Sequence, residues 1–498
     1  MKNDNLGFYL TFALLGLASQ ASAQSVSDLQ GVTPPQPTPS HAAALPKIES
    51  RPAEPSATVG GQTVALQSVE ISGNKAIESA ILLGQLGDIK GRRLDMAGLT
   101  ALSDQLGIYY RASGYPFAQV YLPPQSLKDG KLEINVIEGS YGVVSAAGLH
   151  NLPASAQPFL NYGLESGDPI LNSKLERTLL ILDDQPGIKV KPVLKPGAQQ
   201  GQADLIVNVE RSSDVKAELG LDNTGARSTG QYRTRASLYV NSPFLFGDRI
   251  SLNGLYTSEA MWLGSLDYEM PLGSSGLRGQ IGYAHTSYQL AGAFTALDAK
   301  GLANVTTAKL SYPVVRSQAT NVLLSVGLQH KDLEDHFGTG DITRKKSSNG
   351  VPLGLQFDKR DTLLGGGVSY GSLSWLSGQL RLDAAMMATD ATTAATQGRF
   401  NKVTLDVARI QKIAGDLSFY GRYSGQWANK NLDSSEKFNL GGYYGVRAYP
   451  VGEGAGDKGW LTQLELRYSI DGATPFFFYD FGQTNINARP WVLNSTQN

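Results

Sequence analysis

The sequence contains no cysteine among its 498 residues, and this absence excludes two classes of site. Without thiols the chain can form neither a disulfide framework nor a thiolate-bound metal centre. Charged residues are scarce at 17% of the chain, against roughly 25% in typical soluble domains. The formal net charge of −1 shows no basic excess. We therefore expect no nucleic acid among its partners.

Catalytic and metal-binding patterns are missing as well. The histidines follow no ligand spacing, and no G-x-S-x-G hydrolase motif occurs. The five histidines are His41, His150, His285, His330 and His336. Gly454, Gly456 and Gly459 satisfy G-x-G-x-x-G, but they precede a predicted strand instead of joining a strand to a helix. We therefore expect no enzyme activity, no cofactor and no metal site.

Long apolar runs are also rare. The run from Leu6 to Ala18 is shorter than the ~20 residues that a spanning helix needs. Lys2 precedes it, and Ala21-Ser22-Ala23 follows as a small-residue cleavage site. This pattern predicts a signal peptide over residues 1–23, with a short membrane anchor as the alternative. Because no second run of spanning length follows, any membrane crossing by the mature chain must use strands.

Residues 24–62 are rich in proline, alanine and serine. Such a composition buries too little apolar surface to fold alone and favours extended conformations. We interpret the segment as a linker, and a ligand for a proline-binding domain is the alternative.

From residue 63 to 211 the pattern is α+β and occurs twice. Leu99, Leu102 and Leu106 form an apolar stripe with helical spacing in the first copy. In the second copy, Ser173 to Glu176 has the spacing of a capping box at a helix start. The expected elements are strands at 64–72, 118–122, 131–137, 189–194 and 203–209, with helices near 77–86, around 99–106 and from 173. We predict two tandem β-α-α-β-β modules, over residues 63–138 and 139–211.

After Ser212 the apolar period changes from 3.6 to 2. In residues 417–427 the odd positions, such as Phe419 and Trp427, are apolar or glycine, and the even positions, such as Arg422, are polar or aromatic. Residues 232–240 and 460–470 alternate in the same way. Such segments, separated by glycine- and asparagine-rich turns, are typical of a transmembrane β-barrel. We predict an antiparallel barrel over residues 213–498; a soluble β-sandwich or propeller is the alternative.

Several motifs now carry a family resemblance. The stretch YYRASGYPFAQVYLPPQSLKDGKLEINVIEG, residues 109–139, resembles the first POTRA domain of two-partner secretion transporters, outer-membrane proteins that export haemolysin- and haemagglutinin-like exoproteins. The residues that carry this resemblance are Gly114, Tyr115, Pro123, Pro124, Gln125, Gly130 and Gly139. Residues 175–190 are similar to the second POTRA domain of this family, and residues 220–252 to the start of its barrel.

The resemblance also implies a role for the glycine-rich loop at residues 439–459. In this family and its barrel-assembly relatives, such a loop carries a V-R-G-F/Y motif and folds into the lumen. Val446, Arg447, Ala448 and Tyr449 occupy that place, with alanine where the family has glycine. The resemblance pairs the arginine with an F-x-D-x-G motif, here Phe478, Asp480 and Gly482. A bidentate arginine–carboxylate pair suits a partly dehydrated lumen. We expect it to hold the loop.

The resemblance implies sixteen strands, whereas the periodicity after residue 213 predicts about thirteen or fourteen. We therefore expect the barrel to be truncated at its C-terminal side. It further implies a mechanism without nucleotide, in which the POTRA domains bind an unfolded exoprotein. Some family members have a pore-plugging helix where residues 24–62 lie, so a remnant of that plug is an alternative to a linker. An assembly insertase or a general porin is the alternative function.

The expected partners are a secreted exoprotein, outer-membrane lipid, and the periplasmic chaperones and barrel-assembly machinery that would insert the chain. The expected location is the outer membrane of a Gram-negative bacterium, with the POTRA domains in the periplasm.

Overall fold

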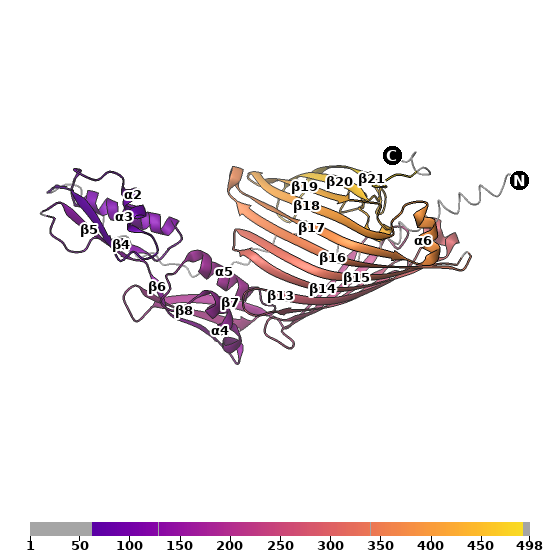
Figure 1. The fold of residues 1–498 in the computed structure, drawn as a ribbon, viewed down its shortest axis with the longest axis horizontal. Helices are drawn as coiled ribbons and strands as arrows, with labels where there is room; N and C mark the ends of the chain where they lie inside the picture. Colours follow the sequence, from indigo (N-terminus) through magenta and orange to yellow (C-terminus); the bar gives the residue numbers. More distant parts are fainter. Residues whose placement is uncertain (1–61, 128, 339, 492–498) are drawn as a thin grey trace. The chain divides into compact units, whose positions relative to one another are not determined.

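The computed structural model describes residues 62–127, 129–338 and 340–491 (Figure 1). The predicted signal peptide, and the predicted linker except its last residue, lie outside these residues. The described chain divides into two compact units, one ending at Ser212 and the other starting at Ser213. In the described part of the chain, no helix is long and apolar enough to cross a membrane.

The first module is a three-stranded sheet covered by helices. Its elements are β1 (Val64–Ala65), β2 (Ser68–Ser72), α2 (Ser79–Leu86), β3 (Arg93–Leu94), α3 (Met96–Ala112), β4 (Gln119–Tyr121) and β5 (Lys131–Ile137). The strand order is β2-β5-β4, parallel between β2 and β5 and antiparallel between β4 and β5. The predicted leucine stripe of α3 is buried against Leu132 and Ile134 of β5. This packing forms the core of the module.

The second module repeats the element order. Its elements are β6 (Ser140–Gly148), α4 (Leu152–Gly163), α5 (Asn172–Asp183), β7 (Ile188–Pro196) and β8 (Gln202–Arg211), with strand order β6-β8-β7. The predicted capping box is wrong, because Ser173 lies inside α5 and no side chain caps the helix. Instead, the Asn172 N–H donates to the Gly114 carbonyl of the first module at 2.9 Å. A backbone carbonyl satisfies a donor of the first turn.

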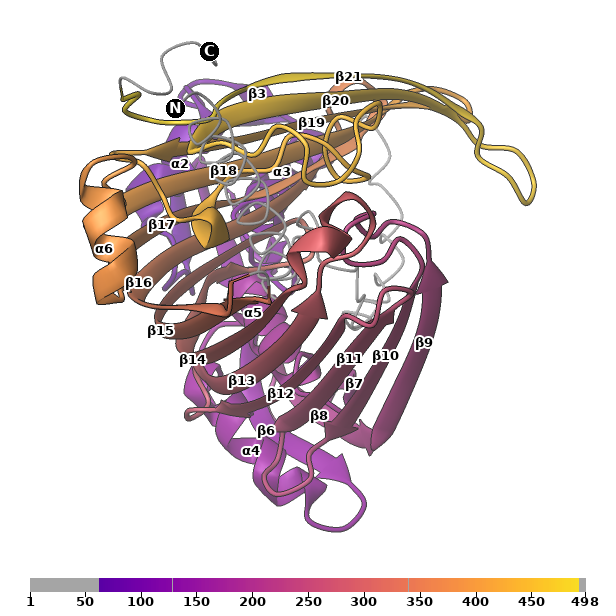
Figure 2. The same cartoon turned by 90° about the vertical axis from the view of Figure 1, so that its right-hand side faces the viewer.

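The second unit is one antiparallel sheet of thirteen described strands, in which each strand pairs with the next along the chain. They are β9 (Val215–Asp222), β10 (Arg233–Asn241), β11 (Arg249–Thr257), β12 (Trp262–Pro271), β13 (Arg278–Gln289), β14 (Ala299–Arg316), β15 (Thr320–Phe337), β16 (Ile342–Asp361), β17 (Gly367–Leu382), β18 (Gly398–Ala414), β19 (Leu417–Ala428), β20 (Lys458–Tyr468) and β21 (Phe476–Asn485). The number lies in the predicted range of thirteen or fourteen. Figure 2 shows the sheet curving around a concave interior, which we call the lumen.

Because neighbouring strands run in opposite directions, successive connections lie alternately at one end of the sheet and at the other. We call the end where β9 starts the proximal end and the opposite end the distal end. Short connections join strands at the proximal end, and the helical segments η1 (Gly292–Leu297) and α6 (Ala384–Ala391) lie in distal connections. The connection from β19 to β20, residues 429–457, is also distal and contains η3 (Ser434–Glu436). We call this whole connection the loop; it includes most of the glycine-rich segment expected over residues 439–459. The 3-10 turn η2 (Leu363–Gly365) is proximal.

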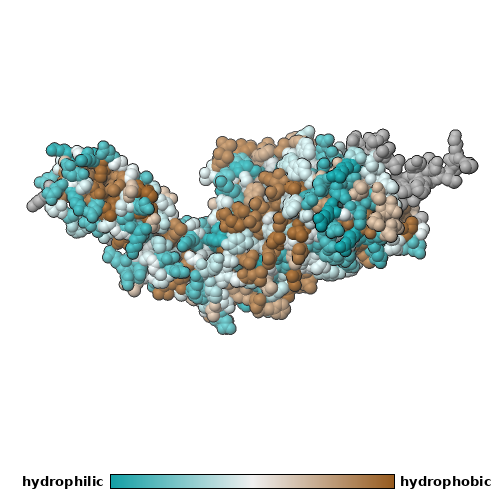
Figure 3. Space-filling view, viewed as in Figure 1, coloured by the Kyte–Doolittle hydropathy of each residue, from teal (hydrophilic) through white to brown (hydrophobic). Residues whose placement is uncertain are grey.

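The two faces of the sheet differ as the alternation predicts. On β19 and β20, Phe419, Trp427 and Leu466 are exposed on the outer face, whereas Arg422 and Glu465 are buried on the inner face. Figure 3 shows apolar side chains in a band that crosses the strands of the sheet, and hydrophilic ones nearer α6. An apolar outer band with a polar interior is the arrangement that a barrel in a membrane requires.

Candidate functional site

The β19–β20 connection turns back into the lumen instead of projecting away from the sheet (Figure 2). Its chain folds on itself, since the Val446 N–H donates to the Leu440 carbonyl at 2.7 Å. Gly445 makes this close approach feasible, because a Cβ there would lie 2.1 Å from the same carbonyl oxygen. The predicted glycine-rich loop is therefore a compact turn with internal backbone hydrogen bonds.

The structure brings Arg447 and Asp480 together on the inner face of β21. The Arg447 Nε lies 2.7 Å from Asp480 Oδ2, and Nη2 lies 2.6 Å from Oδ1. The backbone N–H of Arg447 donates to Oδ2 as well, at 3.1 Å. The side chain of Asp480 is only 3% exposed and that of Arg447 16%. This is a bidentate, charge-assisted pair with little access to water.

A second carboxylate and an aromatic ring complete the environment of the arginine. Nη1 of Arg447 lies 2.5 Å from Glu465 Oε1 on β20. The other oxygen of Glu465 accepts from Arg467 Nε at 2.7 Å. The guanidinium carbon stands 4.0 Å from the centre of the Phe478 ring, which is a cation–π distance. We call Arg447, Asp480, Glu465 and Phe478 the tip site.

The other motif residues shape the loop and the strand beside it. Val446 is buried with Phe438 and Leu461. Ala448 is not among the non-glycine residues with positive φ in the described chain, so alanine fits there without the strain that glycine would relieve. Tyr449 is exposed, and its N–H donates to the Val446 carbonyl at 3.1 Å.

Gly482 permits the loop to lie close to β21. A Cβ on Gly482 would stand 2.7 Å from Leu440 Cδ1 of the loop. It would also stand 2.5 Å from the Trp460 carbonyl oxygen of β20. Glycine is therefore required by packing at this position.

Sequence reasoning missed further residues that hold the loop. Arg422 Nη1 donates to the Tyr444 carbonyl at 2.6 Å, and Gln463 Nε2 donates to the Gly445 carbonyl at 2.8 Å. Asp406 holds Arg422 in place through Nε at 3.0 Å. Alternation had already assigned Arg422, Gln463 and Glu465 to the polar faces of their strands. That signal could have nominated them, but not their partners.

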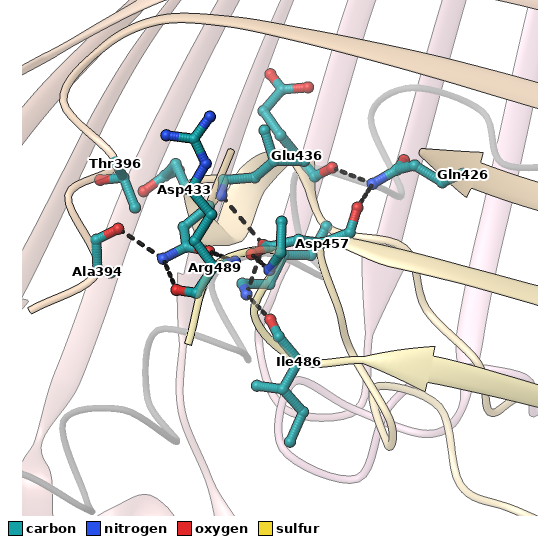
Figure 4. A network of polar contacts seen from close by, with 12 residues as sticks. Ala394, Thr396, Gln426, Asp433, Glu436, Asp457, Ile486 and Arg489 are labelled. Carbon is teal, nitrogen blue, oxygen red and sulfur yellow. Dashed lines mark hydrogen bonds and ion pairs between the residues drawn. The ribbon is translucent and has the colours of Figure 1, made fainter. Parts of the chain in front are cut away.

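At the distal end, Asp457 joins three segments of the chain (Figure 4). Its carboxylate accepts from Lys437 Nζ and from the N–H of Ala488, both at 2.8 Å. It also accepts from the N–H of Leu432 at 3.1 Å. Gln426 donates to the carbonyls of Asp457 and Glu436. The start and the end of the loop are thereby tied to the residues after β21.

The POTRA motif residues lie at turns and at the junction of the two modules. Tyr115 packs edge-on against Tyr110, with ring centres 6.0 Å apart. Gly114, Gly130 and Gly139 all have positive φ. The carbonyl of Gly139 accepts from the Ile170 N–H at 2.9 Å, as Gly114 accepts from Asn172. A side chain would be strained at each of these φ values, and a Cβ on Gly130 or Gly139 would also clash with neighbouring atoms.

Gln125 extends the edge of the first sheet with its side chain. Pro123 and Pro124 follow β4 and cannot donate to a ladder. Beyond them, Gln125 Nε2 donates to the Glu133 carbonyl at 2.7 Å and its Oε1 accepts from the Glu133 N–H at 2.8 Å. The amide therefore takes the place of one residue of a neighbouring strand on β5.

No group of three or more histidine, aspartate or glutamate side chains within the described ranges is arranged to hold a metal ion.

The chain matches two family models. Residues 201–491 match the family described as haemolysin secretion/activation protein ShlB/FhaC/HecB. Residues 64–139 match the POTRA domain of ShlB type.

Individual proteins give the same result. The heme/hemopexin transporter protein HuxB of Haemophilus influenzae is 26% identical over 82% of this chain and 74% of its own length. The hemolysin transporter protein ShlB of Serratia marcescens is 23% identical over 86% of this chain and 76% of its own. The solved structure of CdiB from Escherichia coli superimposes with a TM-score of 0.72 at 20% identity, covering 97% of this chain and 89% of that one. The structural match shows the POTRA-plus-barrel fold.

Proposed function

This chain belongs to the haemolysin secretion/activation protein family ShlB/FhaC/HecB, and we propose that it exports one large exoprotein through its lumen. Family membership makes it an outer-membrane protein with its POTRA region in the periplasm, in a family of transporters and not of enzymes. The relatives are two-partner secretion transporters, named for heme/hemopexin and hemolysin. The proposed substrate class is accordingly a secreted adhesin- or haemolysin-like protein with an N-terminal secretion domain.

The tip site is the observation that carries the proposal. Residues 439–457 lie in the lumen, and Arg447 holds them there through two carboxylates on neighbouring strands. An exported chain needs that space, so the loop must release Arg447 before passage. Arginine suits this role because its charge persists at any physiological pH, while water entering the lumen can replace its hydrogen bonds. Arg447 and Asp480 thus act as the lock that keeps the loop in its resting position.

Recognition begins at the open edges of the POTRA sheets. An extended exoprotein segment would add as a strand, with main-chain hydrogen bonds giving affinity. The β7 edge suits this poorly, since Pro192 and Pro196 lack the N–H group. At β6, Gln157 Oε1 accepts from the Ala146 N–H at 2.7 Å and its Nε2 donates to the Val144 carbonyl at 3.0 Å. An incoming strand could replace this amide, as it could replace Gln125 beside Glu133.

Energy comes from the exoprotein and not from a nucleotide. The periplasm supplies no ATP. An exported chain that folds outside the cell no longer exchanges with the unfolded chain in the lumen, so folding biases the direction of export. The apolar outer face would contact outer-membrane lipid. Periplasmic chaperones and the barrel-assembly machinery would insert the chain.

The test is secretion of a defined substrate. The chain is co-expressed with the N-terminal secretion domain of a candidate exoprotein, and that domain is measured in the medium. Arg447→Ala should lower secretion, whereas Arg227→Ala, an exposed arginine in another distal connection, should not. Absence of secretion by the parent chain with every candidate would refute the proposal. Broad envelope defects on deletion, instead of the loss of one secreted protein, would favour an assembly insertase.

A further inference from the structure

A second set of buried charges holds the loop near the distal end. The Nζ of Lys331 on β15 lies 2.5 Å from Glu436 Oε1, and the Nζ of Lys402 on β18 lies 2.7 Å from Glu436 Oε2. The side chains of Lys331 and Glu436 are 1% and 2% exposed. Glu436 belongs to η3, in the first part of the loop (labelled in Figure 4). A carboxylate from the loop is therefore enclosed between two lysines from the sheet.

A neighbouring pair repeats the arrangement one strand further on. Lys346 of β16 lies 2.9 Å from Asp433 Oδ2, and both side chains are nearly buried. Lys346 also donates to Ser434 Oγ at 3.3 Å. We call Lys331, Lys346, Lys402, Asp433 and Glu436 the stem site. In it the acids come from the loop and the lysines from the sheet.

The stem site is separate from the tip site in space and in composition. Lys402 and Ala408 are six residues apart on β18, and Ala408 pairs with Arg422, which lies beside the loop tip. At about 3.3 Å per residue, this distance along the strand is about 20 Å. The two sites share no residue and contact different strands, since the tip site uses β20 and β21. Either site could therefore open without the other.

On the basis of the proposed function, we propose that the stem site is a second, independent attachment of the loop to the sheet and closes the distal part of the lumen. We call residues 433–436, the loop segment held by this site, the stem. Removing one partner from a buried ion pair leaves a desolvated charge. Neutralising Glu436 would do this to two lysines at once. The seated stem should then lose about 100-fold in population relative to the unseated one.

The arrangement also sets the charge of the open lumen. When the stem leaves, it withdraws the two carboxylates and leaves three ammonium groups on the inner face of β15, β16 and β18. The carboxylate of Asp335 on β15 stays beside these ammonium groups, with its Oδ2 4.0 Å from Lys346 Nζ, and offsets one of the three positive charges. The distal lumen thereby becomes cationic, so the open channel should prefer anions and favour passage of acidic over basic segments.

Channel recordings on the purified full chain in planar bilayers test this inference without any exoprotein. Glu436→Gln should raise the ratio of open to closed time by about 100-fold. The open channel should prefer anions in the parent and in the variant alike, because the stem carboxylates have left the lumen in both. Glu453→Gln, an exposed carboxylate on the same loop, should behave as the parent does. Lys331→Met combined with Glu436→Gln should open less than the product of the two single effects, because the variants remove one shared contact.

A labelling experiment reads the stem position directly. Because the chain has no cysteine, Ser434→Cys introduces a single thiol at a buried stem position. A membrane-impermeant maleimide should label it slowly in the parent and faster with Glu436→Gln. If Glu436→Gln does not reach the outer membrane, Asp433→Asn decides the matter with the same readouts.

The outcomes separate this inference from the proposed function. Parental recordings and labelling for Glu436→Gln, together with opening by Arg447→Ala, would overturn the stem site and leave the lock in place. Parental recordings for both variants would overturn both, since the loop would then not close the lumen. Opening by Glu436→Gln without loss of secretion would support the stem site as an attachment of the loop and not a substrate contact.

Discussion

Arg447 and Asp480 form three hydrogen bonds across 33 positions of sequence, two from the guanidinium and one from the arginine's own backbone N–H. The backbone bond matters because it ties the loop's path, and not only one flexible side chain, to β21. The pairing therefore fixes both where the loop lies and how its tip is turned.

We predict that Arg447→Lys opens the channel although it keeps the positive charge. An ammonium group cannot make the paired contacts of the planar guanidinium with Asp480 and Glu465. Loss of one charged hydrogen bond costs about 2 kcal/mol, or about a 30-fold higher ratio of open to closed time in bilayer recordings. Arg227→Lys, on an exposed distal connection, is the matched control. Unchanged gating in Arg447→Lys would mean that charge alone holds the loop.

The two carboxylates of the tip site should differ in importance. Asp480 accepts three hydrogen bonds from Arg447, whereas Glu465 accepts one and also holds Arg467. Asp480→Asn should therefore open the channel more than Glu465→Gln, by about tenfold for each 1.4 kcal/mol of difference. Recordings on both single variants give the ranking, and the reverse order would contradict this geometry.

Gly482→Ala should disturb the loop through packing alone. The new methyl group would clash with Leu440 of the loop and with the backbone of β20. Overpacking of this kind costs about 1–3 kcal/mol. We expect more frequent opening in recordings and a lower unfolding temperature of the inserted protein. Gly254→Ala on β11 is the control, because its φ is not positive and a Cβ there would meet only the Leu263 carbonyl oxygen at 4.0 Å; it should leave gating unchanged.

Gln125→Ala should destabilise the first module modestly. Both backbone groups of Glu133 lose their partner, but water reaches them because the site is exposed. The expected cost is about 1 kcal/mol in the free energy of unfolding. Thermal unfolding of a soluble fragment of residues 62–212 measures it. Gln67→Ala supplies the control, an exposed glutamine of the same module. An equal loss in both variants would show that the amide does not complete the sheet.

The periplasmic modules should lose stability at alkaline pH. Burial, with the hydrogen bond to Glu138, raises the pKa of Tyr110 well above its ordinary value, and burial raises the pKa of Tyr141 likewise. Below pH ~10 both tyrosines are protonated in either state, so they contribute no pH dependence. Above it, the unfolded chain ionises first and stability falls, by up to about 1.4 kcal/mol per pH unit for each tyrosine.

Denaturant unfolding of the 62–212 fragment between pH 9 and 11 measures this slope. Tyr110→Phe cannot ionise at that position and should remove about half of the slope. A slope unchanged by Tyr110→Phe would contradict the assignment to Tyr110.

Local patterns in the sequence determined much of this protein. Period-2 alternation assigned Phe419 and Trp427 to the outer face and Arg422 to the inner face of β19, because neighbouring strand residues point to opposite sides. Helical spacing likewise identified the buried leucines of α3. The V-R-x-Y and F-x-D-x-G motifs nominated Arg447 and Asp480 as partners through the family resemblance. Each of these signals is short in sequence or carried by a motif.

Tertiary structure alone decided the remaining contacts. Lys331 and Glu436 are 105 positions apart, and nothing near either residue indicates that both would be buried together. The helix α5 begins at Asn172 because a carbonyl of another module satisfies its N–H, which overrides the local capping pattern. Gln125 replaces a strand residue only because β4 ends where β5 continues. Such pairings depend on the register and curvature of strands distant in sequence, which no local pattern encodes.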